Sequence, residues 1–168
     1  CTFSGNWAYN EGGGVFNCMS SPVMTNCILW GNTASVGSEI YNYPDVSRSS
    51  RPVVSYCDVQ GGWEGPGNID ANPGFVDADD LRLVSGSPCT DAGDDGAVTE
   101  AVDIDGVTRI LDGDCDETAT VDMGAYELEI DGEMPAFVTT WDTSLGAGAT
   151  VTLALAGTVD ATIDWGDG

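Results

Sequence analysis

The feature that most constrains this chain is an internal repeat near its N-terminus. The segment CTFSGNWA at residues 1–8 recurs as CILWGNTA at 27–34, an offset of 26, and CDVQGG follows at 57–62, at a further offset of 30. Between these copies, GVFN at 14–17 matches EIYN at 39–42, an offset of 25. A repeat of this length is typical of a solenoid, in which each unit buries its apolar side chains against the next unit. The leucine-rich solenoid is the rival interpretation, but its L-x-x-L-x-L frame is missing.

Period-2 alternation predicts which side chains of the repeat face inward. We treat residues 23–29 and 53–59 as two continuous strands. The expected inward columns are then Cys1/Cys27/Cys57, Phe3/Leu29/Val59, Val23/Val53 and Thr25/Ser55. Cysteine in such a column behaves as a small apolar residue, so we expect a ladder of stacked thiols. The column Asn6/Asn32/Gly62 follows a glycine and fits a corner with left-handed backbone.

The opposite face of the same strands is expected to point outward. It carries Met24, Ile28, Trp30, Val54, Tyr56 and Asp58. Such a patch is unusually apolar for a solvated face, so we favour packing against another chain or a loop. Two alternatives stay open: contact with a glycan, through stacking on Tyr56 and Trp30 beside Asp58, and plain exposure.

The charge balance excludes several classes of partner. The chain has 28 acidic residues against four basic ones, all arginine, and a net charge of −24. Phosphate contacts require Lys or Arg, so we expect no nucleic-acid partner, and anionic membrane surfaces are excluded on the same ground. No segment has the roughly 18–20 apolar residues of a membrane helix. Candidate strands are short and separated by Gly, Asn, Asp, Ser or Pro, which predicts an all-β fold.

The sequence also resembles a known family. The segments NCILWGNTA, VSYCDVQGGWEGPGNIDANPGFVDADDLRLVSGSPCTDAGDD, VDIDGVTRILDG and VDMGAYE resemble the choice-of-anchor Q and pectate-lyase-like domains of bacterial surface proteins. The resemblance covers about residues 1–128. It implies a right-handed parallel β-helix whose last turns run through 67–76, 81–84 and 121–127. An irregular cap rich in Asp and Gly is expected at about 85–120.

That Asp-rich stretch is the candidate metal site. Asp103, Asp105, Asp112, Asp114 and Asp116 place carboxylates at alternate positions near glycines, as calcium loops do. The alternative is that these side chains bond their own backbone in Asx turns. Arg109, between the two runs, is expected to be an ion-pair partner. A disulfide between Cys89 and Cys115 would pin this region, and Cys18 has no assigned role.

Catalysis has little support in the sequence. With no His and no Lys, histidine triads and lysine-based schemes are excluded. A glycoside hydrolase needs two facing carboxylates, and Asp58 is the only one at an outward strand position of the repeat. We therefore predict that the chain is not an enzyme, with a β-helix polysaccharide lyase or hydrolase as the alternative.

A second domain is expected after an acidic linker at 129–134. Residues 135–168 alternate as strands, and their ending TIDWGDG resembles PKD-type β-sandwich domains and surface leucine-rich-repeat proteins. Three strands are too few for an immunoglobulin-like sandwich, so truncation or completion by a neighbouring molecule is expected, the latter giving a head-to-tail filament. The predicted protein is an extracellular or cell-surface bacterial structural or adhesive protein, part of a stalk, coat or fibre. A glycan-binding module is the alternative.

Overall fold

The computed structural model describes residues 1–44 and 50–129, and the chain divides into two units, Cys1–Met134 and Pro135–Gly168. The predicted linker beyond residue 129, the predicted sandwich segment at 135–168 and Arg48 lie outside the described residues. The described part is all-β, as expected, and its one helical element is a single 3₁₀ turn, η1, at Asp95–Ala97. No helix among the described residues has the length and apolar character needed to cross a membrane.

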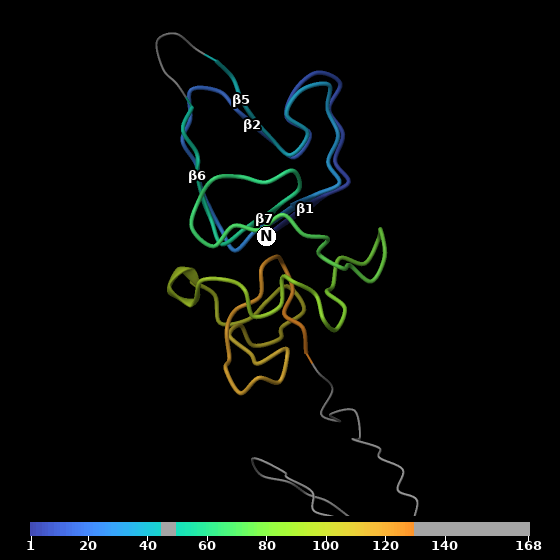
Figure 1. Cartoon of the computed structure of the whole chain (residues 1–168), viewed down its shortest axis with the longest axis vertical. Coiled ribbons are helices and arrows are strands. Elements are labelled where there is room, and N and C mark those ends of the chain that lie inside the picture. Colours follow the sequence, from blue (N-terminus) through green and yellow to red (C-terminus); the bar gives the residue numbers. More distant parts are fainter. Residues whose placement is uncertain (45–49, 130–168) are drawn as a thin grey trace, which may run out of the picture. The chain divides into compact units, whose positions relative to one another are not determined.

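Short parallel strands form three small sheets. The strands are β1 Thr2–Ser4, β2 Val15–Asn17, β3 Val23–Thr25, β4 Ile28–Trp30, β5 Ile40–Asn42, β6 Val53–Ser55 and β7 Asp58–Val59. The sheets are β1-β4-β7, β2-β5 and β3-β6, and every pair is parallel. The chain therefore passes through three strands in coil 1 (residues 1–26), and the three strands of coil 2 (27–56) lie along those of coil 1, as the superposed traces in Figure 1 show.

The registers of these pairs match the offsets of the sequence repeat. Phe3 pairs with Leu29, an offset of 26, and Val15 pairs with Ile40, an offset of 25. Val23 pairs with Val53, and Leu29 with Val59, each at an offset of 30. Coil 3 begins at residue 57 and is much shorter, because the chain has already returned at Ile69 to pair with Asp58.

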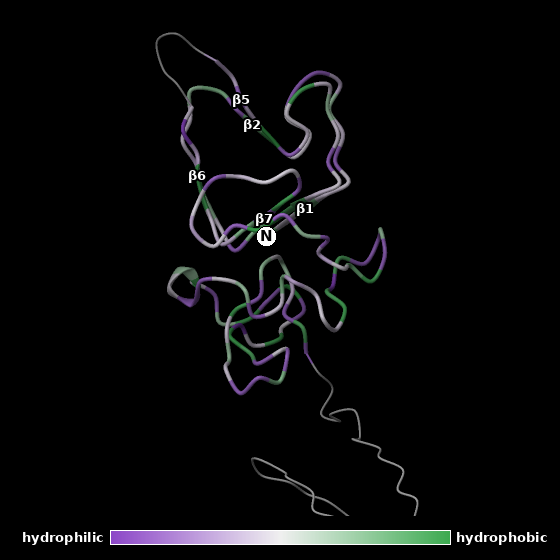
Figure 2. Cartoon of the chain, in the orientation of Figure 1, coloured by the Kyte–Doolittle hydropathy of each residue, from purple (hydrophilic) through white to green (hydrophobic). Residues whose placement is uncertain are grey.

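Apolar side chains fill the interior of the coils. The inner core consists of Met24, Cys27, Leu29, Ile40, Val54, Cys57 and Val59. Phe3, Val15 and Trp63 pack against it from the edges. Figure 2 shows hydrophobic residues along strands such as β2, β6 and β7. Burial of these side chains against the next coil is the main source of stability for such stacked units.

Hydrogen-bonded polar columns run beside the apolar ones. The amide of Asn17 donates to Asn42 Oδ1 at 2.9 Å, and that of Asn6 donates to Asn32 Oδ1 at 2.8 Å. Thr25 and Ser55 hydroxyls lie 3.2 Å apart in the β3-β6 sheet. Each column satisfies polar groups coil by coil, so the repeat is specified by hydrogen bonds as well as by burial.

The corners of the coils correct two of the expectations from sequence. Residues 23–29 are not one continuous strand, because Asn26 has a left-handed backbone (φ 54°) between β3 and β4, and Tyr56 (φ 50°) does the same between β6 and β7. The side-chain alternation is reset there, so Met24 and Val54 point inward while Val23 and Val53 are exposed. The left-handed residues of the other corner are Gly5, Gly31 and Gly61, one position before the predicted Asn6/Asn32/Gly62 column, of which only Gly62 is also left-handed (φ 80°).

Residues 69–129 form an irregular segment that covers the outer side of the β1-β4-β7 sheet. Its backbone pairs only at isolated bridges: Ile69 pairs in parallel with Asp58, whereas the pairs Phe75 with Leu83, Val102 with Thr108, and Leu111 with Thr120 are antiparallel. A second core joins it to the coils and consists of Ile28, Leu83, Cys89 and Met123. Of the segments expected to form the last turns of a β-helix, 67–76 adds one parallel bridge beside β7, at Ile69, while Leu83 of 81–84 and Met123 of 121–127 pack against Ile28 in the second core.

Backbone and side-chain hydrogen bonds hold this covering segment in place. The Asn26 amide receives the N–H of Asp94 at 2.7 Å and donates to the Asp94 carbonyl at 3.0 Å. The N–H of Gly124 donates to the Asn26 carbonyl at 3.0 Å. Gly124 has φ 107°, and a Cβ there would lie 2.9 Å from Ile28 Cδ1, so only glycine fits this approach. The corner residue Asn26 therefore links coil 1 to the segment that covers it.

Leu29 gives a direct test of the inner core. It is fully buried and lies in the middle strand of the three-stranded sheet. We expect Leu29→Ala to lower the free energy of unfolding by about 2–5 kcal/mol, since truncation leaves a cavity. Val23→Ala, at a position 73% exposed on β3, is the matched control and should change stability by less than about 0.5 kcal/mol. Equal effects of the two variants in urea unfolding would contradict this assignment of the core.

Candidate functional site

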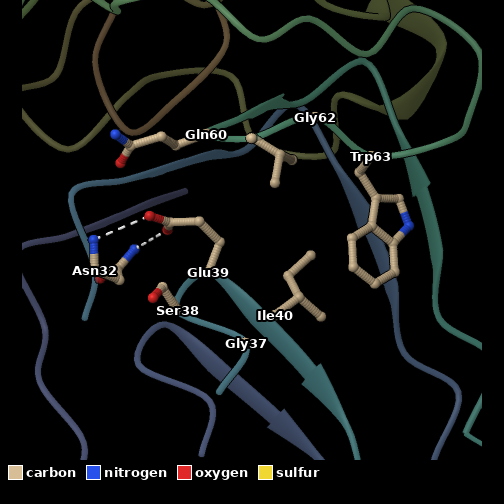
Figure 3. A pocket seen from close by; sticks show the side chains of 10 residues that line it. Asn32, Gly37, Ser38, Glu39, Ile40, Gln60, Gly62 and Trp63 are labelled. Atoms are coloured by element: carbon tan, nitrogen blue, oxygen red, sulfur yellow. Dashed lines mark hydrogen bonds between the residues drawn. The ribbon is translucent and has the colours of Figure 1, made fainter. Parts of the chain in front are cut away.

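A pocket opens where coil 3 is too short to cover coil 2. Its volume is about 360 Å³, and it is lined by residues 37–40 of the β5 strand region, residues 59–63 of coil 3, and Asn32. Figure 3 shows Glu39 in the pocket with its carboxylate directed at Asn32, while Ile40 and the Trp63 ring lie on the other side. The size is at the lower end of the range for small-molecule sites, roughly 300–1,000 Å³.

Glu39 is buried, and Asn32 accounts for its position. The backbone N–H of Asn32 donates to Glu39 Oε1 at 3.0 Å, and the Asn32 side-chain amide donates to Glu39 Oε2. Asn32 also binds Asn6 of coil 1, so Glu39 ends the polar column where coil 3 has only a glycine. Burial raises the pKa of Glu39, although the hydrogen bonds from Asn32 act to lower it. The carboxylate thus has a structural role, and sequence reasoning missed it because Glu39 lies seven residues beyond Asn32, just before β5.

The predicted outward patch is divided between three environments. Met24 and Val54 are in the inner core, as described above. Ile28 and Asp58 do face away from the coil interior, but the covering segment buries both, with exposed fractions of 1% and 0%. Trp30 and Tyr56 are half-buried at the edge of the second core. The predicted platform of Tyr56, Trp30 and Asp58 is therefore packed against the protein's own residues 69–129.

Asp58 is part of a buried polar pair with Cys89. The Cys89 thiol donates to Asp58 Oδ2 at 3.3 Å, and the backbone N–H of Ala71 donates to Asp58 Oδ1 at 3.1 Å. Burial raises the pKa of Asp58 to about 6. Burial and the nearby Asp58 carboxylate raise the pKa of the Cys89 thiol, which keeps it protonated and unreactive.

A second buried acidic group lies around Arg109. Arg109 Nη1 is 3.0 Å from Glu127 Oε1, as an ion-pair partner is expected to be, and its Nη2 donates to the Asp122 carbonyl. Asp122 receives the N–H groups of Asp91 and Leu128 at 2.8 and 2.7 Å. Burial raises the pKa of Asp122 to about 6, while burial and the Asp122 charge raise that of Glu127 to about 8 despite Arg109. This group was not identified from sequence, because its acidic members lie far along the chain from Arg109.

The six cysteines are free thiols in the structure. Cys27 and Cys57 stack in the inner core, where the Cys27 backbone N–H donates to Cys57 Sγ at 3.4 Å, while Cys1 at the edge of the column is exposed. The hydrogen bond with Cys27, together with burial, raises the pKa of the Cys57 thiol. In place of the predicted Cys89–Cys115 disulfide, Cys89 faces Asp58 in the second core and Cys115 is exposed in a turn.

The predicted calcium ligands are distributed over two places. Asp112 and Asp114 lie with Asp91, their carboxylate oxygens within 4.8 Å of one another. Asp103 is elsewhere, receiving the N–H groups of Asp105, Val107 and Glu127.

The remaining members of the set have backbone or ionic partners. Asp105 binds Arg82 at 2.7 Å. Asp112 and Asp114 both receive the N–H of Asp116, which in turn receives that of Thr118. These are the Asx-type bonds of the alternative interpretation. Asp91 was not in the predicted set, because it precedes both acidic runs and is distant from Asp112 in the sequence.

Exposed aromatic side chains on the coils were also not predicted. Trp7 and Tyr9 are 70% and 77% exposed, and their rings meet edge to face at 6.3 Å. Phe16 stacks on Tyr41 at 5.8 Å and lies 6.1 Å from Tyr43. The repeat contains the signal for the second group, since Phe16 and Tyr41 occupy matching positions between inward residues of GVFN and EIYN.

Comparisons of this chain with protein-family models, with curated proteins and with solved structures gave no match.

Thiol labelling tests the state of the cysteines. Without reductant, we expect iodoacetamide to modify Cys1, Cys18 and Cys115 in the folded protein, because these three are exposed. Cys27, Cys57 and Cys89 should react only after denaturation, which mass spectrometry of the digested protein would detect. Recovery of a Cys89–Cys115 linked peptide from a non-reducing digest would contradict the structure.

The raised pKa values of the buried acids predict that the free energy of unfolding falls as the pH rises. Between the ordinary pKa of about 4.5 and the folded value of about 8, folded Glu127 retains a proton that the unfolded chain has lost. Raising the pH through this window therefore favours unfolding, with a slope of up to about 1.4 kcal/mol per pH unit. Asp58 and Asp122, whose pKa values are raised from 3.8 to about 6, contribute a further loss of stability as the pH rises through that range.

The variant Glu127→Gln isolates this effect. It should flatten the decline between pH 6 and 8, because glutamine does not titrate but still accepts hydrogen bonds. Glu64→Gln, at an exposed position, removes the same charge and should leave the slope unchanged. Urea unfolding at a series of pH values gives the measurement, and an equal slope in Glu127→Gln and the parent protein would contradict the assignment.

Proposed function

We propose that this chain is part of an extracellular structural or adhesive protein of a bacterial surface, in a stalk, coat or fibre. We further propose that its coils are those of a right-handed parallel β-helix. The observation that carries the proposal is the stacking of coil 2 on coil 1 in three parallel sheets, with apolar and amide columns in register. Such a stack grows by adding further coils, which is how a protein builds length along one axis.

The hydrogen bonds that three carboxylates accept also support a structural role. The enzyme hypothesis requires Asp58 on an open face. The Asp58 side chain is instead fully buried and accepts hydrogen bonds from the Cys89 thiol and the Ala71 backbone N–H. Asp122 and Asp103 each receive two or more backbone N–H groups. Glycoside hydrolysis needs a pair of carboxylates that face a substrate across a groove. These three hold the covering segment together instead.

Assembly into a filament is part of the proposal. Among residues 1–44 and 50–129, β5 pairs only with β2, so its second edge has no strand partner in the described part of the chain. An open strand edge is a template for strand addition by a neighbouring molecule.

The proposal also includes calcium. It would bind at Asp91, Asp112 and Asp114, where it would relieve the repulsion between clustered carboxylates.

Electron microscopy of the negatively stained native protein, with sedimentation velocity, tests the proposal. We expect long particles with a regular axial repeat, and we expect their average length to fall when EDTA replaces calcium. Compact monomers of unchanged sedimentation coefficient in both buffers would contradict the structural proposal. Turnover of a polysaccharide that is lost in Asp58→Asn would contradict it in favour of an enzyme.

A further inference from the structure

Three aromatic side chains cover the outer surface of the β2-β5 sheet. We call Phe16, Tyr41 and Tyr43 the aromatic face. Asn17 and Ile40 of the same strands are buried inside the coil, so alternation places Phe16, Tyr41 and Tyr43 outside. Phe16 and Tyr43 are 47% and 42% exposed, and the Phe16 ring contacts both tyrosines. These rings are therefore available on the surface as one continuous group.

The backbone holds the rings of this face in fixed positions. Phe16 and Tyr41 are paired residues of a parallel ladder, and their rings stack at an interplanar angle of 26°. Gly12 and Gly37 approach the bases of these two side chains, since a Cβ at Gly12 would lie 2.8 Å from Phe16 Cβ, and one at Gly37 would lie 2.7 Å from Tyr41 Cβ. Aromatic side chains have only two rotatable side-chain bonds, so they lose little conformational entropy when they bind a ligand.

The charge around this face fits an uncharged partner. Residues 1–63 contain only four of the 28 acidic residues (Glu11, Glu39, Asp45 and Asp58) and two of the four arginines. Glu39 and Asp58 are buried, whereas the Glu11 carboxylate lies beside the Tyr41 hydroxyl and adds to the repulsion of an anionic partner. Residues 64–129, in contrast, contain eighteen acidic residues, so a cationic partner is attracted there, and an anionic partner is repelled by the net charge of −24.

The size of the face excludes a stable protein interface. Two strands of three residues, about 10 Å long and roughly 5 Å apart, give an area on the order of 100 Å². A stable protein–protein interface buries about 800 Å² on each partner. The face therefore fits a ligand that contacts it through one or two rings at a time. Sugar rings match this chemistry, because they present C–H groups on their faces and hydroxyl groups at their rims, next to amphipathic tyrosines.

We propose that the aromatic face binds an uncharged polysaccharide, with sugar rings stacked on Phe16 and Tyr43 and sugar hydroxyls bonded to the tyrosine hydroxyls. This inference rests on the adhesive role proposed above, and it names the class of ligand. It places glycan contact on β2 and β5, away from Tyr56, Trp30 and Asp58, which the covering segment packs against.

Isothermal titration calorimetry of the full chain tests the proposal with three probes. Cellohexaose and mannohexaose are uncharged, and oligogalacturonate of similar length is anionic. We expect at least one uncharged probe to bind, with at least a tenfold loss of affinity in the double variant Phe16→Ser/Tyr43→Ser. The matched control is Val23→Ser, which removes an exposed apolar side chain from β3 and should bind like the parent protein. Circular dichroism and urea unfolding of each variant establish that it is folded.

Three outcomes of the titrations would overturn the proposal. They are no binding of either uncharged probe by the parent protein, equal binding by the double variant, and a preference for oligogalacturonate. Loss of self-association in the double variant would instead identify a second copy of the chain as the occupant, and would also overturn it. Electron microscopy of the parent protein separates the two proposals, since particles with a regular axial repeat that bind neither uncharged probe would contradict only the glycan proposal.

Discussion

The left-handed corners at Asn26 and Tyr56 are the constraint on which the rest of this structure depends. Each corner resets the alternation of side chains between two consecutive strands. Met24 and Leu29 can therefore both face the inner core, while Ile28 faces away from it and is buried by the second core. Asn26 tolerates this backbone well, and its amide also binds Asp94 of the covering segment. One residue thus directs side chains into the coil and attaches the segment outside it.

The acidity of the chain has a structural explanation beyond solubility. Residues 69–129 have few paired strands, so their backbone N–H groups need other acceptors. Aspartate oxygens provide them at many positions: Asp103 accepts three backbone N–H groups, and Asp91 and Asp122 accept two each. A coil stack that satisfies its backbone in sheets needs few such residues, and residues 1–63 contain few. The uneven distribution of charge follows from the two ways in which the two parts satisfy their backbones.

The sequence predicts the stacking of the coils more accurately than the surroundings of each side chain. The offsets of 25, 26 and 30 are visible in the repeat, and they are the registers of the sheets. The corners are not visible, because tyrosine at position 56 is a residue type that seldom adopts positive φ. The burial of Asp58 depends on Cys89, which lies far along the chain, and no periodic pattern connects the two. Local periodicity therefore identifies the ladders, whereas contacts between irregular segments require the structure.

The central claim is that successive coils pair in parallel at these registers, and hydrogen-bond scalar couplings in NMR test it most directly. The structure places the Asp58 N–H on the Cys27 carbonyl and the Ile28 N–H on the Cys1 carbonyl, both at 2.9 Å. A long-range HNCO experiment should therefore show cross-peaks that connect Asp58 N with Cys27 C′ and Ile28 N with Cys1 C′. Cross-peaks from these amides to other carbonyls, at a shifted or antiparallel register, would contradict the account.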